Sequence, residues 1–522
     1  MAPTVDDPLG DANRLFRKGD YDGAIQKYRL LLQEKPKSPE PYAGITRSYL
    51  KQQKVDEALA TITDAMSSNP SLLLRVAYGE VLFRQGQIAE AEREWINVVK
   101  AYPSARAYLG LARVKQSLSM SAQFKALIDK AHQLDASDQD IQNLWAGTLP
   151  RQQRIEYLTS YLAGNTSDGA DARTNLAAYL DYMKQREKEP KRSCRLVSHV
   201  TSTETGMVRL TGYDALHLRG YGLNVALNGK PVTLMLDTGA SGILVDRKVA
   251  EKIGIQKVSD TRLSGIGDRG SASGWFGLAS SVRIGELEFQ DCLVNVLDKS
   301  SVVGEDGLIG SDVFGAFLVD IDFPSEKLRL SPLPSRPDQA SQTISLQSAD
   351  DTTPAEEEHS GGSEASTPAK AAPAADKRFH DRYIDPSMQS YTPVFRFGHH
   401  LLIPTKLGES TQKLFLLDTG SVVNHITPRA AQEVTKVSRE SHVLIKGISG
   451  SVAQVFSADD LVLQFGNLRQ RNQEMSAFDL SSLSRSVGTE VSGILGYATL
   501  HRLDIKIDYR DGLVDFQYIP LR

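Results

Sequence analysis

Apolar positions over residues 1–190 recur at helical spacing, and the pattern repeats along the chain. Alanines in similar surroundings recur at nearly equal intervals, at Ala24, Ala58 and Ala91. Prolines close the units at a similar interval, at Pro36, Pro70 and Pro103. A period of about 34 residues with a small residue where two helices cross predicts stacked helical hairpins over residues 10–190. A fourth, degraded unit is expected around residues 122–135.

Two later segments, residues 207–333 and 379–522, consist of short apolar runs broken by Gly, Asn and Asp, which is the pattern of β-strands and turns. The two segments resemble each other and predict two copies of one fold. Residues 334–378 between them are mainly Pro, Ala, Ser, Thr, Glu and Gly. Such a composition buries too little apolar surface to offset chain entropy, so a disordered linker is expected there.

Composition narrows the class of protein. A chain of 522 residues with 40% hydrophobic and 24% charged residues and a net charge of −4 is expected to form several globular domains. It has no basic stripe, so nucleic acid is not an expected partner. No apolar window approaches the roughly 20 residues of a membrane span, and the first residues lack a secretory signal pattern. We expect a cytoplasmic protein as given, or a periplasmic or extracellular one if an export signal was trimmed.

The two cysteines, Cys194 and Cys292, fall in segments whose patterns suggest different structural units. They are too few for a disulfide framework or a thiolate metal cluster. We therefore expect two unpaired thiols.

In each strand-patterned segment, an apolar strand ends in an aspartate, and a Thr-Gly turn follows it. In the first segment, Asn228-Gly229 predicts a two-residue hairpin turn, and the strand that follows ends at Asp237. In the second segment, the apolar run before Asp418 ends in the same way. One Asp-Thr-Gly sequence is ordinary turn chemistry. Two of them in matching surroundings indicate a duplicated site.

The spacing after the two aspartates also matches. Counted from Asp237 and Asp418, the intervals to Gly265 and Gly447 differ by a single position, and those to Gly285 and Gly466 and to Asp298 and Asp479 are identical. Apolar segments bounded by glycine follow at similar intervals, at Gly307–Gly310 and Gly493–Gly496. Each copy closes with an Ile-Asp-aromatic strand. The copies therefore share a whole domain pattern.

This pattern resembles the retropepsin-like and pepsin-like aspartic peptidases, and the helical repeats resemble the tetratricopeptide repeat. The resemblance implies a multidomain protein with an N-terminal α-solenoid, followed by two all-β retropepsin-like barrel lobes that form a pepsin-like bilobal unit. It implies that Asp237 and Asp418 are the catalytic pair. It implies active-site loop support from Thr238, Gly239, Ser241, Thr419, Gly420 and Ser421. It also implies hairpin flaps over the substrate, for which the candidates are Gly265, Ile266, Gly267, Gly447, Ile448 and Gly450.

Paired aspartates suit peptide hydrolysis because two carboxyl groups a few ångströms apart do not both ionise readily, and they share a proton. One carboxylate can take a proton from water while the other carboxyl group hydrogen-bonds the scissile carbonyl. This chemistry needs no metal and no cofactor. The leading hypothesis is an aspartic endopeptidase that acts on a polypeptide substrate, with the repeats recruiting the substrate or a protein partner on their concave face.

Two features depart from the family pattern. Val422 stands where the first copy has Ser241, so a hydrogen bond that supports Asp418 is expected to be missing. The flap tyrosine of pepsins has no counterpart, and Trp275 is a substitute by position only.

Three other patterns are interpreted as structural. Residues 265–270 spell GxGxxG, but no helix pattern follows as a dinucleotide site requires. Three histidines lack further ligands at metal-binding spacing: His399, His400 and His425. Four aspartates alternate along the terminal strands and predict one solvated face: Asp320, Asp322, Asp504 and Asp508.

Several alternatives stay open. The chain could be a scaffold that binds peptides without cutting them, and the repeats could be a rigid spacer or a dimerisation surface. The catalytic pair could form between two chains, as in dimeric retropepsins, although the differences between the copies favour a monomer with an intramolecular pair.

Overall fold

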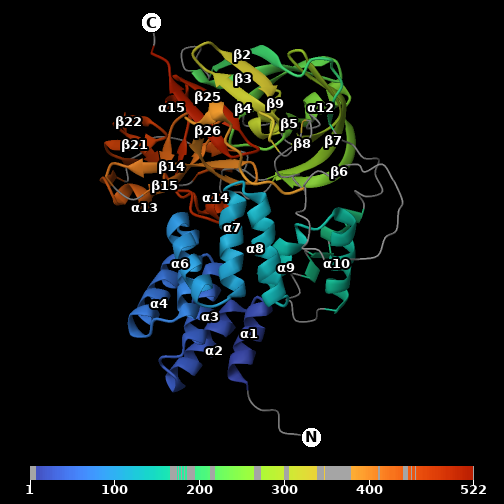
Figure 1. The fold of residues 1–522 in the computed structure, drawn as a ribbon. Helices are drawn as coiled ribbons and strands as arrows, with labels where there is room; N and C mark the ends of the chain where they lie inside the picture. The colour runs from blue at the N-terminus through green and yellow to red at the C-terminus, as the bar shows by residue number, and fades with distance from the viewer. Residues whose placement is uncertain are drawn as a thin grey trace. The chain divides into compact units, whose positions relative to one another are not determined.

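The protein is described here from a computed structural model, shown in Figure 1. The model describes residues 7–164, 173–184 (without 175, 178 and 182), 194–211, 218–263, 272–298, 305–337, 346, 378–409, 412–438, 445–447, 450–452 and 454–520. The chain forms two compact units, one with the helical repeats and one with both strand-rich segments.

The helical unit is a row of hairpins. Its helices are α1 (Pro8–Arg17), α2 (Tyr21–Glu34), α3 (Pro39–Lys51), α4 (Val55–Ser68), α5 (Leu72–Arg84), α6 (Ile88–Ala101), α7 (Ala105–Ser117), α8 (Ser121–Leu134), α9 (Gln139–Ala146) and α10 (Arg151–Gly164). The pair α7 and α8 has 13 and 14 residues, like α3 with α4 and α5 with α6. The fourth repeat is therefore a full hairpin despite its degraded sequence. None of the described helices has the length and apolar character that crossing a membrane requires.

Trp95 shows why glycine recurs in the first helix of successive pairs. Its side chain is 1% exposed. A Cβ added at Gly79 or Gly110 would lie only 2.5 or 2.4 Å from the indole. The ring of Trp95 therefore fills the space between α5 and α7 that two glycines leave open, and Trp95 is a core residue.

The second unit is built from strands. The elements before residue 340 are β1 (Arg195–Leu196), β2 (Thr203–Thr211), β3 (Leu218–Leu227), β4 (Lys230–Asp237), β5 (Ile243–Asp246), α12 (Arg247–Ile253), β6 (Gln256–Leu263), β7 (Ala272–Ile284), β8 (Leu287–Leu297), β9 (Gly307–Gly310), η1 (Ser311–Val313), β10 (Phe317–Asp322) and β11 (Lys327–Pro332). Strands β2 to β11 are called the first lobe.

The elements after residue 380 are η3 (Pro386–Met388), β12 (Thr392–Pro393), β13 (Phe395–Phe397), β14 (His400–Leu407), β15 (Gln412–Leu417), β16 (His425–Ile426), α13 (Pro428–Gln432), β17 (Val437–Ser438), β18 (Lys446–Gly447), β19 (Gly450–Ser451), β20 (Phe456–Ala458), β21 (Leu461–Phe465), β22 (Leu468–Asn472), β23 (Met475–Ala477), α14 (Ser481–Val487), β24 (Gly493–Leu495), α15 (Tyr497–Leu500), β25 (Leu503–Asp508) and β26 (Leu513–Tyr518). Strands β12 to β26 are called the second lobe.

The two lobes repeat one strand arrangement. In the first, β4 lies between β3, which is antiparallel to it, and β9, which is parallel. In the second, β15 lies in the same way between β14 and β24. Strands β10 and β25 pair with each other and join the lobes in the order β12-β26-β25-β10-β11-β2. The duplicated fold expected from the spacing is present.

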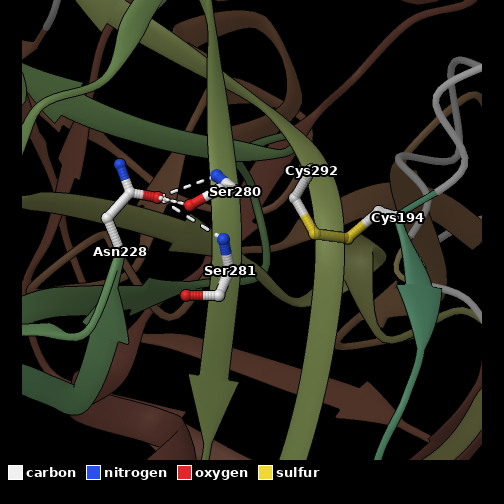
Figure 2. Close-up of a disulfide and its surroundings, with 5 residues drawn as sticks. All are labelled: Cys194, Asn228, Ser280, Ser281 and Cys292. Carbon is white, nitrogen blue, oxygen red and sulfur yellow. Dashed lines mark hydrogen bonds between the residues drawn. A yellow bond between two sulfur atoms is a disulfide. The ribbon is translucent and has the colours of Figure 1, made fainter. Parts of the chain in front are cut away.

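The hairpin between β3 and β4 turns at Asn228 and Gly229, as predicted, with φ of 50° and 73°. Positive φ at both positions gives the turn a twist that matches its strands. The Asn228 side chain also anchors the turn, because its Oδ1 accepts hydrogen bonds from the Ser280 and Ser281 amides at 2.7 and 3.4 Å (Figure 2). This holds the hairpin of β3 and β4, which ends at Asp237, against β7, the strand with which β3 pairs.

The expectation of two unpaired thiols is wrong. Cys194 and Cys292 form a disulfide, and both half-cystines are buried (Figure 2). Sequence patterns placed Cys194 outside the first copy, but β1 pairs with β8 and brings it beside Cys292. The segment before the first lobe therefore belongs to the strand-rich unit.

Replacing both cysteines with alanine should lower the free energy of unfolding by about 2–4 kcal/mol, because the crosslink closes a long loop in the unfolded chain. The two cysteines are 98 residues apart in sequence. Urea unfolding with and without dithiothreitol measures the effect. Reductant should bring the native protein to the stability of the variant and leave the variant unchanged; no effect of reductant on the native protein would contradict the prediction.

Parts of the range expected to be a linker are packed. Arg336 is 8% exposed and pairs with the fully buried Asp511 of the second lobe at 2.5 Å. Leu346 is 5% exposed, lies in the same core as Cys194, and donates its amide to the Cys194 carbonyl at 2.9 Å. Most of the remaining range lies outside the described residues. The segment between the lobes is thus attached to the strand-rich unit at these two points.

Candidate active site

The two predicted aspartates meet between the lobes. Asp237 ends β4, and Asp418 directly follows β15. A Cβ placed on Gly239 would lie 2.7 Å from the carboxyl carbon of Asp418, and one on Gly420 would lie 2.5 Å from that of Asp237. Each carboxyl group therefore lies against the glycine of the opposite loop, and any larger residue at either glycine would push the pair apart.

Backbone amides hold both carboxyl groups in place. Gly239 donates its amide to Asp237 Oδ1 at 2.8 Å. Gly420 and Ser421 donate theirs to Asp418 Oδ1 at 2.9 and 3.1 Å. The Asp-Thr-Gly turn thus orients each side chain through its own backbone.

The two threonines tie the lobes together. Thr238 Oγ1 donates to the Leu417 carbonyl at 2.9 Å, and Thr419 Oγ1 donates to the Leu236 carbonyl at 2.8 Å. Each hydroxyl also accepts the amide of the other threonine at 3.0 Å. The threonines are 1% and 2% exposed. Four hydrogen bonds related by near-twofold symmetry therefore fix the spacing of the two aspartate loops.

The glycine-bounded apolar segments lie beside the active-site loops. Strands β9 and β24 are buried along their whole length. A Cβ at Gly310 would lie 2.4 Å from the Ala240 carbonyl oxygen, and one at Gly496 would lie 2.2 Å from that of Val423. These glycines allow the loops to close onto the strands that support them.

Both carboxyl groups have a raised pKa, so the pair retains a proton more readily than exposed carboxyl groups do. Burial raises the pKa of Asp237, while hydrogen bonds, first that of the Gly239 amide, and the nearby His399 act against this rise. Burial raises the pKa of Asp418 further, well above its usual value, and the charge of Asp237 is the next cause. Two buried carboxylates repel each other, so one proton shared by Asp237 and Asp418 is the favoured state.

The lobes differ in the loop that follows each aspartate, at Ser241 in the first lobe and Val422 in the second. In the first lobe, Ser241 Oγ donates to Asp312 Oδ2 at 2.9 Å. At the matching positions the second lobe has Val422 and Ala498, and the Ala498 amide donates to the Val422 carbonyl at 3.0 Å. The serine and its acidic partner are thus replaced together, and a backbone hydrogen bond holds the second loop. Ser421 Oγ donates to the Val423 carbonyl at 3.0 Å.

Sequence reasoning missed two supports of the site. Asp312 also accepts the Gly242 amide at 3.0 Å, which fixes the first loop. Ser311 shares a hydrogen bond between its hydroxyl and that of Tyr509 in the other lobe. The sequence offers one signal for Asp312. When the residues after Gly310 and Gly496 are aligned, the first copy has an aspartate where the second has Ala498.

Only some of the flap candidates lie among the described residues. Gly265, Ile266 and Gly267 lie outside the described residues. Ile448 also lies outside them. Gly447 and Gly450 are cross-strand neighbours in the short pair β18 and β19. Trp275 is 8% exposed and belongs to the core of the first lobe, so it is no flap residue.

The histidines have separate environments. The rings of His399 and His400 are half-buried, with centroids 3.8 Å apart and planes tilted by 37°. His425 is 5% exposed and packs edge-on against Phe478. Burial lowers the pKa of His425 to about 4, so it is a neutral core residue. Among the described residues, no three His, Cys, Asp or Glu side chains form a group that could hold a metal ion.

The prediction of a solvated face on the terminal strands is wrong. Asp322, Asp504 and Asp508 are 6%, 8% and 0% exposed. Strands β10 and β25 pair with each other in the middle of the sheet that joins the lobes, so they have strands on both sides. The register places Asp322 opposite Asp504. Burial, followed by the charge of Asp320, raises the pKa of Asp504 to about 6.

Asp504→Asn should reduce the pH dependence of stability. A carboxyl group whose pKa is about 6 in the folded state, against about 3.9 in the unfolded state, stabilises the fold while protonated. This contribution is complete below about pH 4 and is lost as pH rises through 6. The variant should gain about 2 kcal/mol over the native protein between about pH 4.5 and 7.5.

The free energy of unfolding in urea, measured at about pH 4.5 and at about pH 7.5, tests this prediction. Asp298→Asn is the control, because Asp298 is exposed. Parallel pH profiles for Asp504→Asn and the native protein would refute the prediction.

Comparison with known protein families agrees with this architecture. The aspartyl protease model matches residues 223–313, which include Asp237 and Asp312. Tetratricopeptide repeat models match residues 15–72, 46–106 and 76–114. Asp418 and the rest of the second lobe lie outside the matched ranges. The second lobe is recognised as similar to the first by its strand order and by the matching hydrogen bonds of its aspartate loop.

Curated relatives match the chain over a limited part. DNA damage-inducible protein 1 of Cryptococcus neoformans var. neoformans serotype D is 31% identical over 111 residues, which are 21% of this chain and 25% of that protein. The UBA domain-containing protein Mud1 of Schizosaccharomyces pombe is 29% identical over 110 residues, 21% of this chain and 32% of that protein. The chain therefore spans about a quarter to a third of the length of these relatives.

Two solved structures are each similar to a part of the chain. Aspartic proteinase from Irpex lacteus has a TM-score of 0.33 and 13% identity, with 61% of this chain and 97% of that chain covered. A thermophilic tetratricopeptide repeat protein of Thermus thermophilus has a TM-score of 0.28 and 18% identity, with 34% and 97% covered. The family models and the site geometry together give the assignment. The chain combines tetratricopeptide repeats with an aspartyl protease domain.

Proposed function

We propose that this protein is an aspartic endopeptidase with Asp237 and Asp418 as its catalytic pair. The observation that carries the proposal is the reciprocal placement of the two carboxyl groups, each against the glycine of the opposite loop. Their raised pKa values support a shared proton, which peptide hydrolysis by two carboxyl groups requires.

In the proposed reaction, a water molecule bound between the carboxyl groups attacks the scissile carbonyl carbon. Asp237, the carboxylate, accepts a proton from the water, and Asp418, the acid, donates its proton to the carbonyl oxygen. The tetrahedral intermediate then loses its amine: the C–N bond breaks, the nitrogen takes the proton held by Asp237, and a hydroxyl proton returns to Asp418. Both carboxyl groups end in their starting states.

We further propose that one chain supplies the complete site. The lobes share the β10–β25 strand pair, the threonine hydrogen bonds, and a cluster of Tyr221, Phe323 and Tyr497 with ring centroids 5.6–6.0 Å apart. The loops also differ at Ser241 and Val422, so two copies of one lobe would not reproduce this site. The helical repeats would recruit the substrate or a partner.

The test is cleavage of a mixed peptide library from about pH 3 to about pH 8, with and without a statine-type transition-state mimic. An active peptidase should cut the library and be inhibited by the mimic. A protein that cuts nothing at any pH would be a peptide-binding scaffold, and cleavage that the mimic leaves unchanged would require another site.

We propose an oxidising compartment, such as the periplasm or the cell exterior, as the working location. The buried Cys194–Cys292 disulfide supports this, because reducing compartments keep most protein thiols reduced. Thiol alkylation in denaturant directly after cell lysis tests it, because unfolding exposes both cysteines to the reagent. Both cysteines should resist alkylation until a reductant is added; immediate alkylation of both would place the protein in a reducing compartment.

A further inference from the structure

One asparagine side chain holds the loop that carries Asp418. Asn424 lies at the end of this loop, directly before β16, and is 4% exposed. Its Oδ1 accepts the amide of Gly496 at 2.9 Å. In the first lobe, the matching amide of Gly310 donates to the backbone carbonyl of Gly242 at 2.8 Å. A side chain therefore makes in the second lobe the contact that the backbone makes in the first.

Three successive amides attach this loop to α15 and the residue before it. Besides the amide that Asn424 binds, Tyr497 donates its amide to the Ser421 carbonyl at 2.7 Å, and Ala498 donates its amide to the Val422 carbonyl at 3.0 Å. Of these three hydrogen bonds, the one to Asn424 alone ends on a side chain. A substitution can therefore remove it without changing the backbone.

The amide nitrogen of Asn424 connects the loop to β22. Nδ2 donates to Asn472 Oδ1 at 2.9 Å and to Thr499 Oγ1. Thr499 Oγ1 in turn donates to Gln470 Oε1 at 2.6 Å. Gln470 and Asn472 lie on β22, an edge strand of its sheet. The oxygen and the nitrogen of the Asn424 amide both have partners, so the side chain is held in one orientation.

The first lobe shows that packing alone does not require an amide at this position. Counted from each aspartate, the position of Asn424 matches that of Ile243, which is also 4% exposed. The first loop is fixed instead by the Asp312 carboxylate, which accepts the Gly242 amide at 3.0 Å. A buried amide costs free energy unless it is hydrogen-bonded, so the hydrogen bonds of Asn424 distinguish the second loop from the first.

We propose that Asn424 is a positioning residue that keeps Asp418 at the separation from Asp237 that proton sharing requires. The Ser421 amide, which donates to Asp418 Oδ1, belongs to the loop that Asn424 fixes. Release of this loop would let Asp418 move, and a misplacement of about 1 Å can cost about 10²-fold in rate. This inference rests on the peptidase function proposed above.

The test is Asn424→Ala in the full-length chain, which leaves the Gly496 amide and Asn472 Oδ1 without this partner. The value of kcat for a peptide substrate should fall about tenfold to a hundredfold, with KM within about threefold of the native value, because the substrate-binding surfaces stay in place. The pH profile of kcat/KM should change as well. Two carboxyl groups that move apart repel each other less, so the upper apparent pKa of the profile should fall by about one pH unit.

Thr405→Val is the matched control, because Thr405 is a buried polar residue of the same lobe whose hydroxyl donates to the Ile403 carbonyl. It should keep the native kcat and pH profile, and circular dichroism melts should show each variant folded at the assay temperature. A native pH profile in Asn424→Ala, or an equal loss of kcat in Thr405→Val, would overturn the proposal.

A second variant covers the case in which Asn424→Ala does not fold. Asn472→Ala removes one acceptor of the Asn424 amide from the half-buried edge strand β22. It should change kcat and the pH profile in the same direction but less, by about threefold in kcat. If Asn424→Ala is unfolded, native kinetics in Asn472→Ala would refute the positioning role.

Hydrogen–deuterium exchange separates this proposal from the peptidase function. In Asn424→Ala, and not in Thr405→Val, the peptide that covers residues 493–500 should exchange faster, because the Gly496 amide loses its partner and the loop loosens. This measurement needs no activity. An inactive native chain would count against the peptidase function, whereas exchange as slow as native in Asn424→Ala would count against the role of Asn424, whatever the activity.

Discussion

Asp237→Asn and Asp418→Asn should each lower kcat/KM for peptide hydrolysis by about 10³-fold, because loss of a general acid or base costs about 10²–10⁴-fold. Asparagine keeps the size of the side chain and can still accept the amide of Gly239 or Gly420 at its Oδ1. It cannot take up or release a proton. In Asp237→Asn the water keeps its proton, and in Asp418→Asn the carbonyl oxygen receives none.

Single-substrate kinetics on purified variants measures this loss, with Asp298→Asn as the matched control. Asp298 directly follows β8, is exposed, and occupies a position repeated in the second copy by Asp479. The control should cut at the native rate. If one asparagine variant kept native activity while the other lost it, the two aspartates would not form one shared pair.

Thr238→Val and Thr419→Val should each destabilise the strand-rich unit and reduce activity together. Valine has nearly the shape of threonine but leaves one carbonyl and one amide of the opposite loop without a partner, both in a buried place. Each buried unsatisfied group costs about 1–3 kcal/mol, so a loss of about 2–6 kcal/mol in the free energy of unfolding is expected. The loops would also lose the contacts that set the spacing of the two carboxyl groups.

Urea unfolding and kcat measure the two effects, and Thr→Ser at each position should restore most of both. Thr405→Val is the control, since Thr405 is equally buried but its hydroxyl donates to the Ile403 carbonyl within its own lobe, at 3.0 Å. It should cost about 1 kcal/mol and leave kcat near the native value. A loss of activity as large in Thr405→Val as in Thr238→Val would mean that general destabilisation explains the effect.

Local sequence rules accounted for the elements that carry the site. The Asn228-Gly229 turn and the helical hairpins follow from residue types and spacing, because turn geometry and helix packing depend on neighbours in the sequence. The same rules missed the packing of Arg336 and Leu346, because one buried side chain in a polar segment has no signal in the average composition.

Contacts between distant segments decided the rest. The disulfide depends on the pairing of β1 with β8, and the burial of Asp322 and Asp504 depends on the pairing of β10 with β25. An alternating strand has the same sequence whether its polar side meets water or another lobe. The replacement of Ser241 and Asp312 by Val422 and Ala498 is likewise understood only once the two loops are superimposed.

The helical repeats and the two copies of an aspartate-bearing β fold were predictable from residue types and spacing, because periodicity and turn residues act over short distances. Only the tertiary structure decided that Asp237 and Asp418 lie against each other's glycine loops, that threonines lock those loops, and that burial raises the pKa of both carboxyl groups. The physical reason is that proton sharing depends on distance and on exclusion of water, and these arise only when segments 181 residues apart are packed together.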